Sequence, residues 1–196
     1  MLARLSSPLE QLRDHYTVVV IGSGYGGAIA ASRLARAGQD VCVLERGREF
    51  MPGEFPDTQL ELTAQTQADS PAGHVGSRTA LVDIRANKDM NVLIGCGLGG
   101  TSLLNANVAL EAEPAVFADP VWPHALIDDL DTLVADGLAR ARAMLEPTPY
   151  PASAPALRKL EALERSAEAM GAPFYRPPIN VTFEDRVNAA GVEQPA

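Results

Sequence analysis

The feature that most constrains this chain is the stretch VVVIGSGYGG at residues 18–27, where an apolar, β-branched run meets a group of glycines. Such a run is typical of a parallel strand that is buried on both faces. Residues 24–37 are rich in alanine and end before Gly38, which predicts a helix with a glycine stop. Residues 41–45 indicate a second buried strand. Residues 17–45 are therefore predicted to form one β-α-β unit of an α/β, Rossmann-like domain.

Three of these glycines, Gly22, Gly24 and Gly27, stand in the spacing G-x-G-x-x-G between the strand and the helix. Glycine allows a sharp turn off the strand, close approach of a pyrophosphate, and close packing of the helix on the strand. The amino end of the helix offers unpaired N–H groups to phosphates. Glu45, at the end of the second strand, is expected to accept hydrogen bonds from ribose hydroxyls and to repel the extra phosphate of NADP. The pattern predicts dinucleotide binding and leaves NAD and FAD open, with a ligand-free β-α-β unit as the alternative.

A second glycine cluster, GCGLGG at residues 95–100, leads into TSLLNANVALE. Residues 95–118 resemble the first signature of the glucose-methanol-choline (GMC) flavoprotein oxidoreductases. The stretches GSGYGG, LERG and RPPINVTFED resemble the cholesterol oxidase-like bacterial branch of that family. A physical argument also favours a flavin at this cluster, because glycine lets backbone N–H groups approach a flavin closely. A flexible loop without a ligand is the alternative, but it does not explain why two glycine clusters flank one nucleotide-binding unit.

The resemblance implies FAD as the cofactor and oxidation of an alcohol carbon by hydride transfer to the flavin. Steroids are the implied substrate class, other bulky alcohols stay open, and so does the electron acceptor. Some relatives hold the flavin covalently through a histidine near this loop, and this sequence has none between residues 75 and 123, so non-covalent FAD is expected. The residues carried over as FAD contacts are Gly22, Gly24, Gly26, Gly27, Glu45, Gly99, Gly100, Thr101, Asn105 and Val108.

The rest of the chain is predicted from its periodicity and its proline and glycine content. Residues 1–118 are interpreted as the amino-terminal part of the FAD-binding domain, and residues 119–196 as the start of a helical and irregular substrate region. Residues 46–80 are predicted to be mostly loop. Strands are expected at 81–85 and 91–94, helices at 125–145 and 156–170, and an irregular tail after Gly171.

Composition excludes several other classes of protein. The formal net charge of −9 argues against general affinity for nucleic acid, and no segment has the length of a membrane span or a signal peptide. Two cysteines are too few for a disulfide framework, and neither they nor the three histidines have the spacing of a metal site, so no metal is expected. Cys42 is predicted to be a buried small hydrophobe. These features favour a cytoplasmic, reduced environment.

The GMC family places its catalytic histidine near the far carboxyl end of a much longer chain, and no candidate base here matches it. We therefore expect an amino-terminal fragment whose catalytic residues lie beyond Ala196, whose partner is the remainder of the same enzyme, and which lacks turnover. Its sheet is expected to be incomplete and to expose apolar surface. The alternatives are a non-catalytic module that binds FAD or NAD, and an NAD-dependent dehydrogenase, which would need a Tyr-x-x-x-Lys or comparable set that the sequence lacks.

Overall fold

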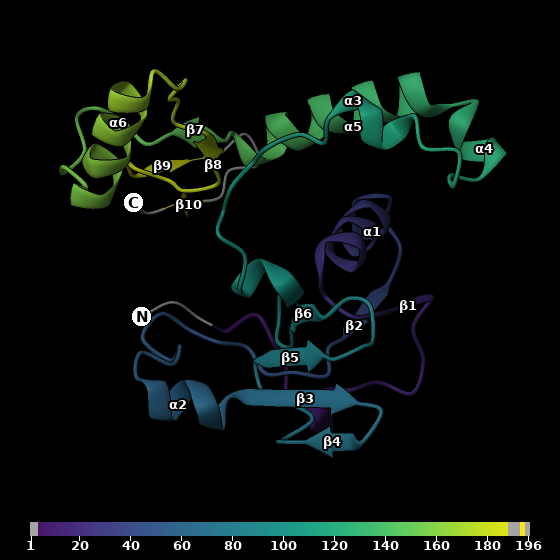
Figure 1. Cartoon of the computed structure of the whole chain (residues 1–196). Helices are drawn as coiled ribbons and strands as arrows, with labels where there is room; N and C mark the ends of the chain where they lie inside the picture. Colours follow the sequence, from purple (N-terminus) through teal and green to yellow (C-terminus); the bar gives the residue numbers. More distant parts are fainter. Residues whose placement is uncertain (1–3, 188–192, 195–196) are drawn as a thin grey trace. The chain divides into compact units, whose positions relative to one another are not determined.

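The computed structural model describes residues 4–187 and 193–194, and these belong to two compact units, Met1–Asn105 and Ala106–Ala196 (Figure 1). The division falls before the predicted domain boundary at residue 118, and the substrate role of residues 119–196 stays a prediction. Within the described residues, no helix combines the length and the apolar character that a membrane crossing requires.

The first unit begins with the β-α-β unit that the sequence predicts. The parallel pairing of its two strands sets Val18 opposite Val41 and Val20 opposite Val43, which confirms the Rossmann-like prediction for residues 17–45. The helix ends before Gly38, which has a positive φ of 81° as a glycine stop requires. The elements up to this point are η1 (Leu9–Gln11), β1 (Val18–Ile21), α1 (Tyr25–Arg36) and β2 (Val41–Leu44).

A four-stranded sheet in the order β4-β3-β5-β6 makes up most of the remaining first unit (Figure 1). The strands β3 and β5 are parallel, whereas β4 and β6 each pair with their neighbour in the antiparallel sense. The strands expected at 81–85 and 91–94 are present as β5 and β6. The elements are α2 (Gln59–Ala64), β3 (Thr66–Ser70), β4 (Gly73–Val75), β5 (Val82–Arg85), β6 (Val92–Gly95) and the 3-10 helix η2 (Gly100–Leu103).

The prediction that residues 46–80 are mostly loop holds for the greater part of the segment but missed three elements, α2, β3 and β4, that fall there. The helix α2 starts with a capping box in which the side chains of Thr58 and Glu61 satisfy each other's backbone N–H groups. The strand β3 has a polar sequence without the apolar alternation by which a strand is predicted. Its Gln67 is nonetheless only 1% exposed, and its amide donates to the carbonyl oxygens of Arg78 and Ala80. Parallel pairing with β5, rather than apolar alternation, makes this segment a strand.

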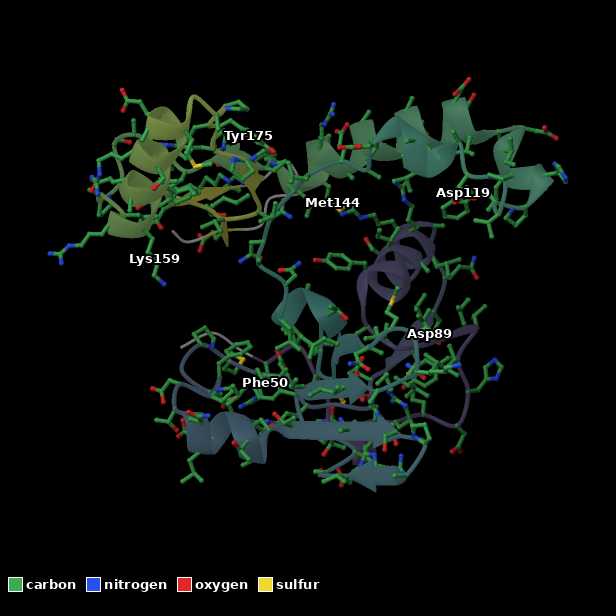
Figure 2. All side chains as sticks on the ribbon, in the orientation of Figure 1. Phe50, Asp89, Asp119, Met144, Lys159 and Tyr175 are labelled. Atoms are coloured by element: carbon green, nitrogen blue, oxygen red, sulfur yellow. The ribbon has the colours of Figure 1, made fainter. Side chains whose placement is uncertain are left out.

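The hydrophobic core of the first unit lies beside this sheet. Phe50, labelled in Figure 2, packs with Leu81 and Val82. Leu103 and Leu104, which follow the second glycine cluster, cover these residues in part. The core therefore fixes where the chain leaves β6 and enters η2. This arrangement sets the position of the second glycine cluster.

The described part of the second unit contains two long helices, two short helices and short strand pairs. The helix expected at 125–145 is divided into α4 and α5 at Asp128–Asp129, whereas the helix at 156–170 is confirmed as α6 and ends at Gly171 with φ 63°. The tail, predicted to be irregular, contributes short strands. The elements are α3 (Pro114–Phe117), α4 (His124–Ile127), α5 (Leu130–Leu145), β7 (Thr148–Pro149), α6 (Arg158–Met170), β8 (Pro178–Ile179), β9 (Arg186–Val187) and β10 (Glu193–Gln194).

The strands β1 and β2 are not buried on both faces, which corrects the expectation for residues 18–21 and 41–45. Ile21 is 87% exposed and Val19 is 50% exposed, and Cys42 is half-buried rather than buried. The physical reason is that β1 and β2 form a sheet with no further strand among the described residues. The exposed apolar surface that was expected of an incomplete sheet is therefore confirmed.

We expect this exposed sheet face to make the chain self-associate, because apolar surface gains free energy on leaving water. Ile21→Thr keeps a β-branched side chain but removes apolar area, so it should weaken the association several-fold. Sedimentation velocity at several protein concentrations would measure the effect. Val75→Thr in β4, where the valine is 72% exposed, is a matched control that should leave the association unchanged. A wild-type chain that stays monomeric and melts in one sharp transition would contradict this expectation.

Candidate functional site

The first glycine cluster forms the tight turn between β1 and α1. Gly22 has a φ of 90°, and its N–H donates to the carbonyl oxygen of Leu44 at 2.8 Å. A Cβ added to Gly27 would lie only 2.0 Å from the carbonyl oxygen of Gly22. The chain's own packing therefore requires glycine at both positions, for the turn and for the close approach of α1 to β1.

Gly24 and Gly26 are glycines for which the described part of the chain gives no packing reason. A Cβ at either position would meet no described atom within 4 Å. Gly24 is the residue before α1, and no described side chain caps the backbone N–H groups at that end of the helix. The amino end of α1 thus has free backbone donors in open space, which is the arrangement that a pyrophosphate requires.

The second glycine cluster contacts the first one directly. Gly99 and Gly100 have φ values of 111° and 62°, and a Cβ on Gly100 would lie 2.7 Å from the Cα of Gly24. Thr101 closes the loop, since its Oγ1 accepts from the N–H of Gly95 at 3.3 Å. Two glycine clusters that are far apart in the sequence therefore converge at the start of α1.

Glu45 lies at the end of β2, next to both glycine clusters. Its Oε1 accepts from the N–H of Gly47 at 3.0 Å, and its Oε2 accepts from the N–H and the hydroxyl of Ser23 at 2.9 and 2.7 Å. Partial burial raises the pKa of the Glu45 carboxyl, but the hydrogen bonds from Gly47 and Ser23 outweigh burial and hold this pKa below its ordinary value. A carboxylate has about four acceptor positions, and Ser23 and Gly47 fill three of those of Glu45, with the backbone of Arg46 as a further donor.

Two partly exposed arginines pair with one buried carboxylate and fix the segment that follows Glu45. The Nη2 of Arg46 donates to Oδ2 of Asp83 at 2.6 Å, and the Nη2 of Arg85 donates to the same oxygen at 2.8 Å. The Asp83 side chain is fully buried in β5. The ion pair therefore connects the end of β2 to the sheet that leads into the second glycine cluster.

Two residues that contribute to this arrangement were not among the sequence-predicted contacts. The hydroxyl of Ser23 accepts from the N–H of Gly99 at 2.9 Å, and the side-chain amide of Asn105 donates to the hydroxyl of Tyr25. Ser23 and Tyr25 occupy the variable positions of the G-x-G-x-x-G motif, and spacing alone does not single them out. Their partners lie on the second cluster, which only the folded chain brings near.

Of the ten predicted contacts, Val108 is the one in the second unit, where it forms a bridge with Ile179. The other nine belong to the first unit, and the role of all ten as FAD contacts stays a prediction. No group of three His, Cys, Asp or Glu side chains among residues 4–187 and 193–194 could hold a metal ion.

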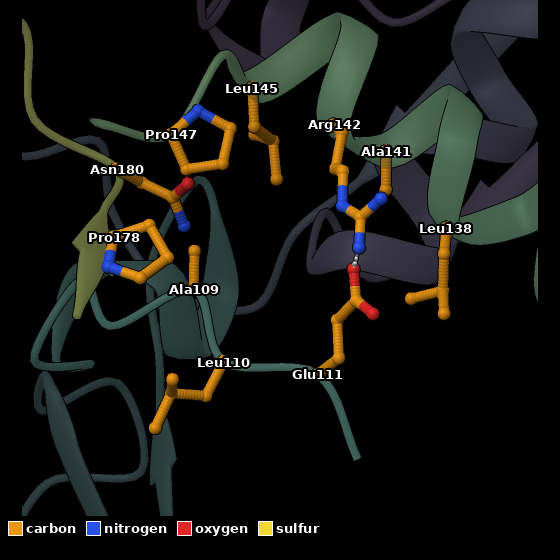
Figure 3. Close-up of a pocket in the computed structure, with 10 residues that line it drawn as sticks. All are labelled: Ala109, Leu110, Glu111, Leu138, Ala141, Arg142, Leu145, Pro147, Pro178 and Asn180. Atoms are coloured by element: carbon orange, nitrogen blue, oxygen red, sulfur yellow. Dashed lines mark hydrogen bonds and ion pairs between the residues drawn. The ribbon is translucent and has the colours of Figure 1, made fainter. Parts of the chain in front are cut away.

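The second unit contains a separate cavity of about 480 Å³ between α5 and the segment at 109–111 (Figure 3). Leu138, Leu145 and Pro178 contribute to its mostly apolar lining. An ion pair between Glu111 and Arg142 crosses one side of it. The Oδ1 of Asn180 is buried at its edge and has no hydrogen-bond partner among the described residues. The cavity thus offers mostly apolar contacts to a small molecule.

Comparison with known proteins gives matches over the same glycine-rich region. Residues 17–93 match the family described as pyridine nucleotide-disulphide oxidoreductase. The chain is 36% identical over 113 residues to a cholesterol oxidase of Mycobacterium tuberculosis (strain CDC 1551 / Oshkosh), covering 58% of this chain and 19% of that protein. It is 38% identical over 99 residues to an uncharacterised GMC-type oxidoreductase of the same organism, covering 50% and 14%. It is 30% identical over 120 residues to a long-chain-alcohol oxidase of Arabidopsis thaliana, covering 60% and 14%.

The fold, the two glycine clusters and these matches together indicate a Rossmann-like, nucleotide-binding unit that is similar to part of known oxidoreductases. These matches support the resemblance to the GMC-type, cholesterol oxidase-like oxidoreductases that the sequence indicated. The chain spans 19% of the length of the mycobacterial cholesterol oxidase. The activity of a whole enzyme is therefore a proposal for this chain.

Proposed function

We propose that this chain binds FAD non-covalently, as the amino-terminal part of an enzyme that oxidises an alcohol to a carbonyl compound. The first glycine cluster and the amino end of α1 would hold the pyrophosphate, Glu45 would hold the adenosine ribose, and the second cluster would lie toward the flavin. FAD supplies the acceptor for the hydride that leaves the alcohol carbon. The contact of Gly100 with Gly24 carries the proposal, because it joins both clusters at a helix end with free N–H donors.

The state of Cys96 supports non-covalent binding. Its side chain is 2% exposed, and burial raises the pKa of its thiol. A thiol that is buried and protonated is a poor nucleophile toward the flavin ring. We therefore expect acid precipitation of the protein to leave all the flavin in the supernatant.

The substrate class that we propose is a bulky, apolar alcohol. Relatives of this chain are named for cholesterol and for long-chain alcohols. The cavity beside α5 is of a size and lining that suit an apolar molecule. A steroid alcohol is one member of this class.

The visible absorption spectrum of the purified protein, followed by a titration with FAD, tests the proposed cofactor. Flavin bands in the spectrum, or saturable binding with FAD released on heating, are expected. A colourless protein that binds NAD in place of FAD would contradict the proposal and favour an NAD-dependent dehydrogenase.

Gly24→Val should weaken FAD binding by at least about tenfold, which corresponds to roughly 1.4 kcal/mol. The new side chain would extend into the space at the amino end of α1, which no described atom occupies within 4 Å of the added Cβ. Because no described atom is displaced, the melting temperature should change by only a few degrees. Flavin fluorescence titration and thermal unfolding measure the two effects. Unchanged FAD affinity would contradict the use of this glycine for the pyrophosphate.

A further inference from the structure

The side chain of Ser23 lies at the point where the first glycine cluster, Glu45 and the second cluster meet. It is 5% exposed. Its backbone N–H and its hydroxyl both donate to Oε2 of Glu45, at 2.9 and 2.7 Å. Burial of a serine hydroxyl requires that its hydrogen bonds be satisfied within the protein. The carboxylate of Glu45 meets that requirement for the donor.

The same hydroxyl accepts a hydrogen bond from the second cluster. The N–H of Gly99 donates to Oγ of Ser23 at 2.9 Å. The single hydroxyl proton goes to Glu45 at 2.7 Å rather than to the carbonyl oxygen of Gly97 at 3.4 Å, because the shorter contact is to a charged acceptor. A continuous chain therefore runs from the Gly99 amide through one hydroxyl to the Glu45 carboxylate.

We propose that Ser23 is a positioning residue that couples the ribose-binding carboxylate to the second glycine cluster, so that the two ends of the dinucleotide site form together. A charged acceptor polarises the hydroxyl and strengthens the bond that the hydroxyl accepts from Gly99. Gly99 precedes Gly100, whose backbone lies against Gly24. The orientation of the Gly99 amide thus sets the contact between the two clusters. This inference rests on the proposed binding of FAD.

The first test is a double-mutant cycle on the dissociation constant for FAD, with Ser23→Ala, Glu45→Gln and the double variant. Loss of a buried bond to a charged group predicts that Ser23→Ala weakens FAD binding roughly ten- to a hundredfold. Because Ser23 acts through Glu45, the double variant should bind FAD with about the affinity of the single variant that binds FAD less tightly. Effects of the two substitutions that simply multiply would overturn the inference, since they would show that the residues act independently.

Ser6→Ala is the matched control, because Ser6 repeats the same bonding away from the site. Its N–H and its hydroxyl both donate to Oε2 of Glu49, at 3.0 and 2.8 Å, on the exposed surface. This variant removes the same kind of hydroxyl from the same kind of partner. Its affinity for FAD should equal that of the wild type.

Hydrogen exchange at the Gly99 amide provides a readout that needs no flavin. We expect Ser23→Ala to speed this exchange at least about tenfold, because the amide loses its acceptor, while Ser6→Ala leaves it unchanged. Unchanged exchange at Gly99 in Ser23→Ala would overturn the inference even if the wild type binds FAD. A wild-type chain that binds no FAD would instead contradict the proposed function, whatever the exchange shows.

Discussion

Gly27→Ala is expected to destabilise the first unit by about 3 kcal/mol and to abolish FAD binding with it. The added Cβ would lie 2.0 Å from the carbonyl oxygen of Gly22 and 3.0 Å from its carbonyl carbon. Both atoms are backbone, so neither can move aside without displacing α1 from β1. Moving α1 would open the turn at Gly22, and it would carry the amino end of α1 away from the second glycine cluster. Urea unfolding followed by circular dichroism, with a flavin titration, measures both losses.

Gly137→Ala is the control for this substitution. Gly137 lies within α5, and a Cβ there would meet no described atom within 4 Å. The same chemical change should therefore raise the stability of the second unit by about 0.5–1 kcal/mol, because alanine favours a helix. If Gly27→Ala unfolded at the same urea concentration as the wild type, the result would contradict the close packing of α1 on β1.

Asp83→Asn is expected to lower the free energy of unfolding of the first unit by about 3 kcal/mol at neutral pH. This is the lower end of the range for breaking a buried pair. Arg46, which loses its partner, is 44% exposed and can still be hydrated, and Arg85 keeps its ion pair with Asp69 at 2.7 Å. The loss should also loosen the segment that carries Glu45, so FAD affinity should fall with stability. Urea unfolding at pH 7 measures the free energy of unfolding, and a flavin titration measures the FAD affinity.

The dependence on pH gives a second test of the same residue. Burial raises the pKa of the Asp83 carboxyl, but the hydrogen bonds and charges of Arg46 and Arg85 outweigh burial, so this pKa lies below its ordinary value of 3.8. A carboxyl whose pKa is lower in the folded state contributes stability above its unfolded pKa. That contribution is lost as the pH falls through the folded pKa. The difference in stability between wild type and Asp83→Asn should therefore be full above about pH 5 and shrink in stronger acid.

Asp40→Asn is the control for the buried pair. Asp40 pairs with Arg13, and their side chains are 45% and 58% exposed. Water screens an exposed ion pair, so this variant should be close to wild type in stability. Equal effects of the two substitutions would contradict a special role for the buried carboxylate.

The β-α-β unit could be predicted from the sequence because every signal for it is local. Apolar runs at 18–21 and 41–44 and the glycine stop at Gly38 act over a few residues. Gly22 and Gly27 could likewise be identified from their spacing, since the turn and the close packing follow from their own backbone. The capping box at Thr58 and Glu61 is also a local signal, although it lies in a segment rich in residues typical of loops.

Tertiary structure alone decided the features that depend on a distant partner. The segment of β3 is polar, and its pairing with β5 makes it a strand and buries Gln67. Ser23 stands at a variable motif position, and it acquires its role from an amide 76 residues away. The sequence by itself determined which backbone can bend and approach closely, because glycine carries that property locally. Which side chains meet around that backbone was decided by the fold, because hydrogen bonds depend on distances in space.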